Sequence, residues 1–350
     1  MGEYKVSLIV PCYNIDSIDF KEVNPFYNMV ESIVNQSFGI ENIEVLFVDD
    51  FSTDNTKSVL NDLSEKYPSF HPIFLEKNSG RPSIPRNVGI DNASSDYIMF
   101  LDQDDFMDSE CVEKLYDEIT CNDVDFVKSN YSIVMDNNVL NYDTGKNERL
   151  VIKPKSEDMI YLVSHFIWGS IYNRDFLNKY SIRFPDTQAE DNLFLSKCYN
   201  FTEKDIISLN DYYSIKYTAN NNNSLSHSFD LKQIDDYENI FEETTDSFIE
   251  YNQSNKFVSL NIERYIIILI GSLLRSNESF KIKKSMVKII KKYILKYGKY
   301  DVSLPLKWNI FSFLIKHEFS FVIHISSKII NTLFENPLFI RLFRNNDYDN

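Results

Sequence analysis

Short apolar segments alternate with amphipathic segments through the first hundred residues. Residues 5–11 (KVSLIVP) form the kind of apolar run that makes a buried parallel strand, and Asn24 and Pro25 then open a helical pattern. A second apolar run, residues 43–48, is followed by a polar turn at residues 52–54 and a second helical pattern. This alternation predicts a doubly wound α/β domain.

Polar residues follow each predicted strand. Residues 72–75 predict a third strand, residues 84–92 a helix, and residues 97–101 (YIMFL) a fourth strand that runs directly into acidic residues. Ligands bind such a sheet beyond the carboxyl ends of its strands. We expect one cleft there to gather Pro11, Cys12, Tyr13, Asn14, Asp49, Asp50, Asn78, Ser79 and Asp102 to Asp105.

The pattern becomes helical beyond about residue 225, after an asparagine run at residues 220–223. The chain has 350 residues and 43% hydrophobic content, which is ample for two cores. We therefore expect an α/β domain over residues 1–225 and a helical, basic region over residues 226–350.

Charge is unevenly distributed along the chain. The net charge of -16 divides into -25 for residues 1–255 and +9 for residues 256–350. Residues 279–300 predict a lysine-rich amphipathic helix, which could lie on an anionic membrane surface, grip an anionic polymer, or pack within a helical subdomain or a homo-oligomer. No nucleic-acid partner is expected, because no reader motif accompanies the charge. The lysines are 281, 283, 284, 288, 291, 292, 296 and 299.

The sequence favours a reduced, cytoplasmic setting. The four cysteines form no CxxC pair and have no histidine spacing suited to zinc. The N-terminus lacks the pattern of a signal peptide, and we identify no run of about 20 uncharged apolar residues that would cross a bilayer. The expected location is the cytoplasm, with at most a peripheral contact on the inner face of the plasma membrane.

An acidic cluster, residues 102–105 (DQDD), ends the fourth predicted strand. Neighbouring like charges are costly unless a cation offsets them, and carboxylate oxygens suit Mg²⁺ or Mn²⁺. Such an ion usually bridges one or two carboxylates to a substrate diphosphate. The alternative is a solvated loop in which Asp105 or Asp108 caps the following helix.

Four motifs occur in order, and together they resemble bacterial glycosyltransferase family 2 over residues 5–217. They are VSLIVPCYN (6–14), VDDFSTD (48–54), NSGRPSIPRNVG (78–89) and YIMFLDQDD (97–105). The third motif especially resembles the wall-teichoic-acid N-acetylglucosaminyltransferase branch of Gram-positive bacteria. The resemblance implies a GT-A-type, Rossmann-like α/β fold with a helical C-terminal region.

The resemblance also implies roles for individual residues. Tyr13 and Asp50 would contact the uracil of a UDP-sugar donor, beside Pro11 in the opening nucleotide loop. Asn78 and Arg86 would help to hold the nucleotide, although a loop arginine is otherwise often a surface charge. Asp102 would bind ribose or sugar, and Asp104 would ligate the metal.

A second acidic pair, Glu190 and Asp191, precedes an apolar helix start. Asp191 could be a helix cap. The family resemblance instead implies that it is the general base, and that Glu190 orients the sugar or the acceptor, where a plain surface carboxylate is the alternative. Relatives often carry a metal-contacting or diphosphate-contacting histidine after the base, for which His227 is the candidate; the alternative is a solvated loop histidine.

These observations predict an inverting enzyme that moves a sugar of the GlcNAc, Glc or Gal class from UDP to a hydroxyl group. The expected acceptor is a cell-envelope glycan or polyol phosphate, such as teichoic acid, capsule or exopolysaccharide. A nucleotidyltransferase of similar fold would instead need a nucleoside triphosphate and release pyrophosphate. A non-catalytic glycan-binding module would keep the fold without turnover.

Overall fold

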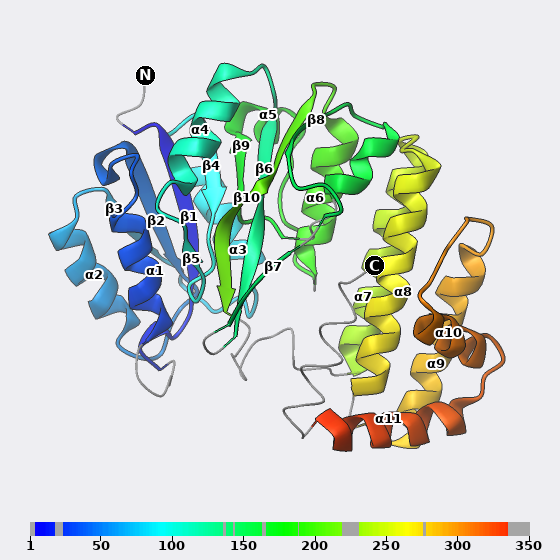
Figure 1. Cartoon of the computed structure of the whole chain (residues 1–350). Coiled ribbons are helices and arrows are strands. Elements are labelled where there is room, and N and C mark those ends of the chain that lie inside the picture. The colour runs from blue at the N-terminus through cyan, green and yellow to red at the C-terminus, as the bar shows by residue number, and fades with distance from the viewer. Residues whose placement is uncertain are drawn as a thin grey trace. The chain divides into compact units, whose positions relative to one another are not determined.

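The computed structural model describes residues 4–17, 24–135, 138–142, 144–162, 166–187, 189–218, 231–275 and 278–334. Its contacts divide the chain into two units (Figure 1). The first comprises Met1–Pro154 and Tyr161–Asn221, and the second Lys155–Ile160 and Asn222–Asn350. The expected boundary at residue 225 lies outside the described residues, so it stays a prediction.

The first unit is built on a mixed sheet of ten strands among the described residues, with eight in the order β3-β2-β1-β4-β9-β6-β10-β5. The first four in this order are parallel, as the sequence predicted. Strand β9 is antiparallel to both β4 and β6, and β10 is parallel to β6. The bounds are β1 Val6–Cys12, β2 Ile43–Asp49, β3 Phe70–Phe74, β4 Tyr97–Phe100, β5 Phe106–Met107, β6 Phe126–Met135, β7 Asn138–Asn141, β8 Arg149–Ile152, β9 Ser170–Asn173 and β10 Ile206–Thr218.

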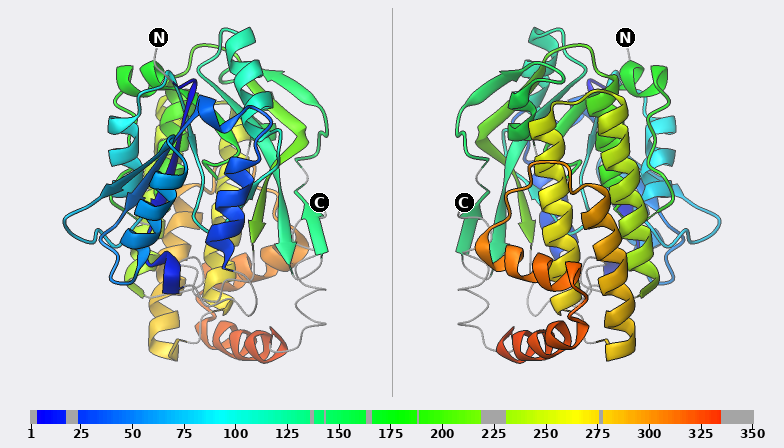
Figure 2. Two further views of the ribbon diagram at one scale, coloured as in Figure 1. Left: turned by 90° about the vertical axis from the view of Figure 1, so that its left-hand side faces the viewer. Right: turned by 90° about the vertical axis from the view of Figure 1, so that its right-hand side faces the viewer.

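Helices cover both faces of this sheet (Figures 1 and 2). On one face, α1 (Pro25–Val34), α2 (Thr56–Lys66) and α4 (Cys111–Cys121) close the core around Leu8, Val10 and Phe47. On the other face lie α3 (Ser83–Asn92), α5 (Arg174–Lys179) and α6 (Glu190–Phe201). Short 3-10 helices span Ile15–Ser17, Ile40–Asn42 and Glu157–Leu162.

Two local features explain where the first and third helices lie. The Asn24 side chain accepts a hydrogen bond from the backbone N–H of Phe26 at 3.0 Å, with Pro25 as the first helical residue, so α1 begins where the sequence predicted. Gly89 of α3 packs against Ile9 of β1 so closely that a Cβ there would collide with the isoleucine side chain. This glycine brings α3 close to the sheet.

The second unit is helical, as the sequence predicted for the region beyond residue 225. Helices α7 (Leu231–Glu250), α8 (Asn255–Arg275) and α9 (Phe280–Lys296) run alongside one another (Figure 2), and α10 (Leu306–Lys316) and α11 (Ser320–Phe334) complete the described part. Phe241 of α7 stacks on Tyr265 of α8 with ring centroids 4.0 Å apart. This unit therefore has an aromatic core of its own.

Helix α8 bears on the expectation that no segment of the chain would cross a bilayer. Residues 255–274 are long and apolar enough to cross a membrane, with a mean hydropathy of 1.7. However, 67% of that window is buried within the protein, where it carries core side chains such as Tyr265 and Ile270. The same length and hydropathy are found in the core helices of soluble proteins, so this helix is weak evidence for a membrane span.

Half of the lysines in residues 279–300 have partners within the helical unit. Lys283 is buried and donates to Ser327. Lys291 pairs with Glu318, Lys292 with Glu238 and Glu242, and Lys296 with Glu242 and Asp246. The packing alternative accounts for these four lysines. The other four, Lys281, Lys284, Lys288 and Lys299, are exposed, and contact with an anionic surface stays a prediction.

Candidate active site

The acidic segment after β4, residues 102–105, forms a turn in which the aspartates differ in how deeply they are buried. The backbone N–H of Asp105 donates to the carbonyl of Asp102 at 3.2 Å, and Asp105 is buried while Asp102 and Asp104 are partly exposed. Asp108 accepts from the N–H of Glu110 and from the hydroxyl of Tyr212, just before α4. The N-cap of α4 is Glu110, which makes no side-chain cap hydrogen bond, so neither Asp105 nor Asp108 is the cap, and the Asp102 carboxylate binds an arginine.

That arginine is Arg86, which α3 places at the centre of three carboxylates. Its Nη2 donates to Asp102 at 2.7 Å, and its Nη1 donates to Glu190 at 2.6 Å and to Asp191 at 3.0 Å. The guanidinium lies over the ring of Phe184, 5.3 Å from its centroid, and only 3% of the Arg86 side chain is exposed. Arg86 is therefore a buried hub, and the alternative of a surface charge is wrong.

Glu190 and Asp191 occupy the first turn of α6. Neither residue caps the helix, because the residue before it, Ala189, is the N-cap and makes no side-chain cap hydrogen bond. Ala189 has a φ of 48°, in the left-handed region that costs a residue with a Cβ about 1 kcal/mol. The side chain of Glu190 is only 12% exposed, so the alternative of a plain surface carboxylate is also wrong.

The electrostatics of this cluster are those of a crowded, buried site. Burial raises the pKa of the Asp191 carboxyl well above its ordinary value; Arg86 opposes the rise, whereas Glu190 and Asp102 add to it. Burial lowers the pKa of Arg86, but the three carboxylates outweigh that effect and raise it above its usual value. A carboxylate whose pKa is raised in this way accepts a proton more readily than an ordinary aspartate.

The loop after β3 is held by Asp50. The Asp50 carboxylate accepts from the backbone N–H groups of Ser79 and Gly80 at 2.9 to 3.1 Å, and the Asn78 side chain donates to the Asp50 carbonyl at 2.8 Å. Asp50 and Asn78 are thus brought together, in contacts that order the loop. Their predicted contacts with a nucleotide stay predictions.

Tyr13 presents an exposed ring beside this loop network. Gln103 accepts from the N–H of Tyr13 at 2.8 Å and donates to its carbonyl at 3.2 Å, which fixes the backbone after β1 while 44% of Tyr13 stays exposed. Pro11 is buried within β1, opposite Val48 of β2. Phe51, which sequence reasoning missed, has a φ of 60° and is also exposed. Its position directly after Asp50 in the second motif was the available signal.

The residues of this edge fit a divalent cation bound together with a diphosphate. Asp104 offers a partly exposed carboxylate, and three neighbouring carboxylates share the single charge of Arg86. Among the described residues, no group of three or more histidine, cysteine, aspartate or glutamate side chains could hold a metal by itself. Mg²⁺ and Mn²⁺ typically bind through one or two carboxylates plus substrate phosphates, and Asp104 offers one such carboxylate. His227 lies outside the described residues.

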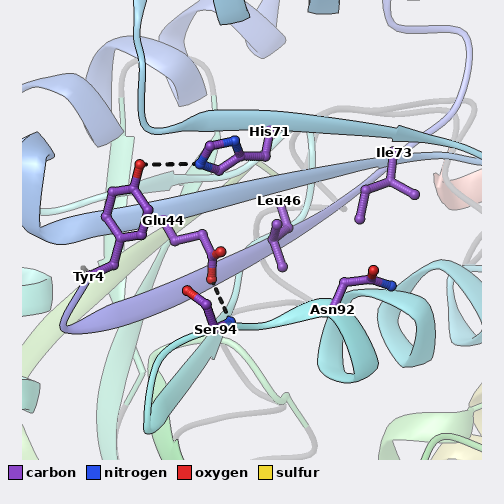
Figure 3. A pocket seen from close by; sticks show the side chains of 7 residues that line it. All are labelled: Tyr4, Glu44, Leu46, His71, Ile73, Asn92 and Ser94. Atoms are coloured by element: carbon purple, nitrogen blue, oxygen red, sulfur yellow. Dashed lines mark hydrogen bonds between the residues drawn. The ribbon is translucent and has the colours of Figure 1, made fainter. Parts of the chain in front are cut away.

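A cavity of about 560 Å³ lies at the opposite edge of the sheet (Figure 3). Glu44 and His71 stand at the starts of β2 and β3, and Ser94 follows α3. The buried Glu44 carboxylate accepts from Ser7 and from the N–H of Ser94, and His71 is hydrogen-bonded to Tyr4. These polar groups satisfy one another far along the strands from Arg86, so the cavity is separate from the acidic site.

Comparison with known proteins identifies the family of the α/β unit. The model of Glycosyl transferase family 2 matches residues 7–180. The chain is 28% identical over 216 residues to a poly(ribitol-phosphate) beta-glucosyltransferase of Bacillus spizizenii, covering 60% of this chain and 32% of that protein. It is also 28% identical over 216 residues to the poly(ribitol-phosphate) beta-N-acetylglucosaminyltransferase TarS of Staphylococcus aureus, covering 60% of this chain and 35% of TarS.

The fold extends the likeness over both units. A crystal structure of S. aureus TarS 1-349 in complex with UDP-GlcNAc matches with a TM-score of 0.70 at 19% identity, covering 95% of this chain and 91% of that chain. The chain spans about a third of the length of the two curated relatives above. Through its α/β unit, the protein belongs to glycosyltransferase family 2 and has the GT-A-type fold.

Proposed function

We propose that the protein is an inverting glycosyltransferase that moves a hexose of the GlcNAc, Glc or Gal class from a UDP-sugar to a hydroxyl of a cell-envelope glycan. The observation that carries the proposal is the Arg86 hub. It joins Asp102 at the end of β4 to Glu190 and Asp191 at the start of α6, within 3.0 Å of one guanidinium. A donor-side carboxylate and a candidate base are therefore held in one place by one side chain.

The donor would bind along the carboxyl edge of the parallel strands. The exposed ring of Tyr13 offers a face for uracil, and the backbone N–H of Asp50 donates to the carbonyl of the preceding Cys12 at 2.8 Å. Asp102, steadied by Arg86, would accept hydrogen bonds from sugar or ribose hydroxyls. When bound, a divalent ion at Asp104 would supply positive charge to the leaving UDP.

Asp191 would act as general base in a single displacement. Its carboxylate takes the proton of the acceptor hydroxyl as that oxygen attacks the anomeric carbon opposite the UDP, which inverts the configuration. The raised pKa of Asp191 makes it a stronger base than an ordinary aspartate, and its hydrogen bond from Arg86 fixes the orientation. Glu190, on the same guanidinium, is placed to orient the sugar or the acceptor.

The acceptor class is proposed from the relatives named above, both of which are named for poly(ribitol-phosphate). The test is a panel of UDP-sugars with and without Mn²⁺, scored for UDP release with a polyol-phosphate polymer and with a neutral glycan, and for the anomeric configuration of the product. We expect metal-dependent transfer to the polymer with inversion. Retention of configuration, or release of pyrophosphate from nucleoside triphosphates instead, would overturn the proposal.

We also propose that the helical unit contacts an anionic membrane surface on the cytoplasmic side. Between residues 302 and 334 the sole acidic residue is Glu318, which is paired with Lys291, whereas lysines 307, 316 and 328 lie in the same segment. Exposed apolar side chains accompany these lysines, a combination that suits anionic lipid. The apolar residues are Leu306, Ile310, Phe313, Phe319, Phe321, Val322 and Ile325.

Vesicle sedimentation tests this contact. We expect binding to vesicles that contain phosphatidylglycerol, little binding to pure phosphatidylcholine, and a loss of about tenfold in the double variant Phe313→Ser and Phe321→Ser. Lys296→Gln is the control, because this lysine pairs within the unit. The membrane proposal fails if the wild type does not bind anionic vesicles and the serine substitutions instead dissociate a homo-oligomer. The exposed apolar residues would then form an interface between copies of the chain.

A further inference from the structure

A lysine that the proposed mechanism does not use lies buried in the α/β unit. Lys128 of β6 is 2% exposed. Its Nζ donates to the carbonyl of Phe166 at 3.1 Å and contacts the hydroxyl of Ser170 at 3.4 Å. A buried ammonium group is expensive to desolvate, so its retention calls for a compensating charge or function.

The strand pleat places Lys128 on the face of the sheet that α6 covers. Phe126, two residues earlier and so on the same face of the sheet, packs against Tyr199 near the end of α6, with ring centroids 6.0 Å apart. Helix α6 begins with Glu190 and Asp191 at the carboxyl edge of the parallel strands. Lys128 is further along β6 towards that edge, by about 6.6 Å.

The contacts of Lys128 hold the turn that enters β9. Phe166 and Ser170 are the two ends of this turn, and Lys128 contacts both. Tyr172 donates to the carbonyl of Ile167 within the same turn at 3.2 Å. Because β9 is antiparallel to β4 and β6, the turn lies at the carboxyl edge where the proposed base is found.

We propose that Lys128 is a positioning residue for sugar transfer: its buried ammonium group secures the Phe166–Ser170 turn and supplies positive charge beneath the carboxylate of Asp191. Arg86 and Lys128 thereby both favour the charged form of the Asp191 carboxylate. The inference rests on the proposed role of Asp191 as base, because that role gives the charge a function.

The titratable groups that act most strongly on Lys128 are Cys198 and Asp191. Cys198 of α6 acts on Lys128, but burial raises the pKa of its thiol, which keeps it neutral. Burial likewise raises the pKa of Tyr172. Burial lowers the pKa of Lys128 to about 8, and Asp191 opposes that fall. Besides Lys128, the groups that act on Asp191 are Arg86, Glu190 and Asp102.

The test compares Lys128→Gln, which is neutral but can still donate to the Phe166 carbonyl, with Lys128→Arg, which keeps the charge. Tyr172→Phe is the matched control, because it removes another bond to the same turn without changing charge. In the glutamine variant, the acidic limb of kcat/KM against pH should move up by about one unit, with about tenfold slower transfer on that limb and recovery at higher pH. The arginine and phenylalanine variants should keep the wild-type limb.

A second measurement detects the effect of the Lys128 charge on the titration of Asp191 without requiring catalysis. Carboxyl ¹³C NMR of aspartate-labelled protein, with the Asp191 signal assigned by its loss in Asp191→Asn, should show the Asp191 titration moving to higher pH in Lys128→Gln. An unmoved signal, or a rate loss equal at all pH values, overturns the role of Lys128 even if transfer is intact. Absence of transfer by wild type from every UDP-sugar, with the Asp191 signal still shifted, would instead overturn the proposed function alone.

Discussion

The α/β unit and the helical unit both place basic side chains among acidic ones, but with opposite degrees of burial. In the α/β unit, Arg86 is 3% exposed and faces three carboxylates at once. In the helical unit, Lys292 and Lys296 join α9 to acidic residues of α7, and the two lysine side chains are 62% and 35% exposed. Water screens the second set, whereas in the first set the guanidinium is buried and water reaches only part of the Asp102 and Asp191 carboxylates, whose side chains are 32% and 21% exposed.

This difference separates an arrangement for chemistry from an arrangement for packing. A buried cluster with more carboxylates than cations holds its charges at a cost in stability, which proteins commonly accept at functional sites. Exposed pairs between neighbouring helices contribute little energy and no unusual reactivity. Substitutions in the two units should therefore differ in size, in salt dependence and in which property they change.

The largest effect is expected from Asp191→Asn. The variant keeps the shape of the side chain but removes the base, so transfer should fall by about 10²-fold or more while affinity for UDP with Mn²⁺ changes only a few-fold. Single-turnover transfer and calorimetric UDP binding measure the two properties separately. If the folded variant transferred sugar at a near-normal rate, Asp191 would not be the base and would only form an ion pair with Arg86. The acidic cluster would then differ from the helical unit in burial but not in function.

The wild-type rate should also follow the titration of Asp191. Only the ionised carboxylate can take a proton, and burial raises its pKa above the ordinary value. The rate should therefore rise with pH through that raised pKa and be lost as pH falls below it. A profile of kcat/KM against pH measures this, and an acidic limb at the ordinary aspartate pKa near 4 would contradict a buried base.

Arg86→Met should cause the next largest effect, on stability rather than on rate alone. Removing the guanidinium leaves Asp102, Glu190 and Asp191 without their shared cation, at a cost of about 3 kcal/mol in the free energy of unfolding. Acidification should recover part of this loss, because protonated carboxyl groups no longer repel one another. Urea unfolding at two pH values checks both statements, with Arg183→Met, an exposed arginine paired with Asp91, as control.

Asp104 and Asp50 should each contribute a different part of the affinity for the donor. Asp104→Ala should remove most of the metal-dependent stabilisation by UDP, whereas Asp50→Ala should weaken UDP even without metal. The structure adds a reason for the second effect, because Asp50 also orders Ser79 and Gly80. Thermal shifts with UDP, with and without Mn²⁺, distinguish the two, and equal UDP affinity in wild type and both variants would remove both residues from the donor site.

The sequence could predict which residues lie near the carboxyl ends of the parallel strands. The alternation of strands and helices along the chain and the polar residues after each strand can both be recognised from short segments of sequence. It could not predict that Arg86 binds Glu190 and Asp191, since pairing across 104 and 105 residues depends on tertiary packing. The antiparallel direction of β9 is equally invisible, because a short apolar run has the same pattern in either direction. Nor does lysine-rich composition reveal that Lys128 and Lys283 are buried, since burial depends on neighbours distant in sequence.

The smallest effect is expected from Lys296→Gln in the helical unit. This lysine pairs with Glu242 and Asp246 at 2.8 Å, but it is 35% exposed, so the loss should be below about 1 kcal/mol and should vanish in 1 M salt. Most of the Arg86→Met loss should persist in the same salt, because the guanidinium that it removes is 3% exposed and salt ions cannot take its place. Urea unfolding of both variants with and without salt measures the contrast. If the two losses were equal in size and equally sensitive to salt, burial would not distinguish the two units, and the acidic cluster could no longer be identified as a site by its electrostatics.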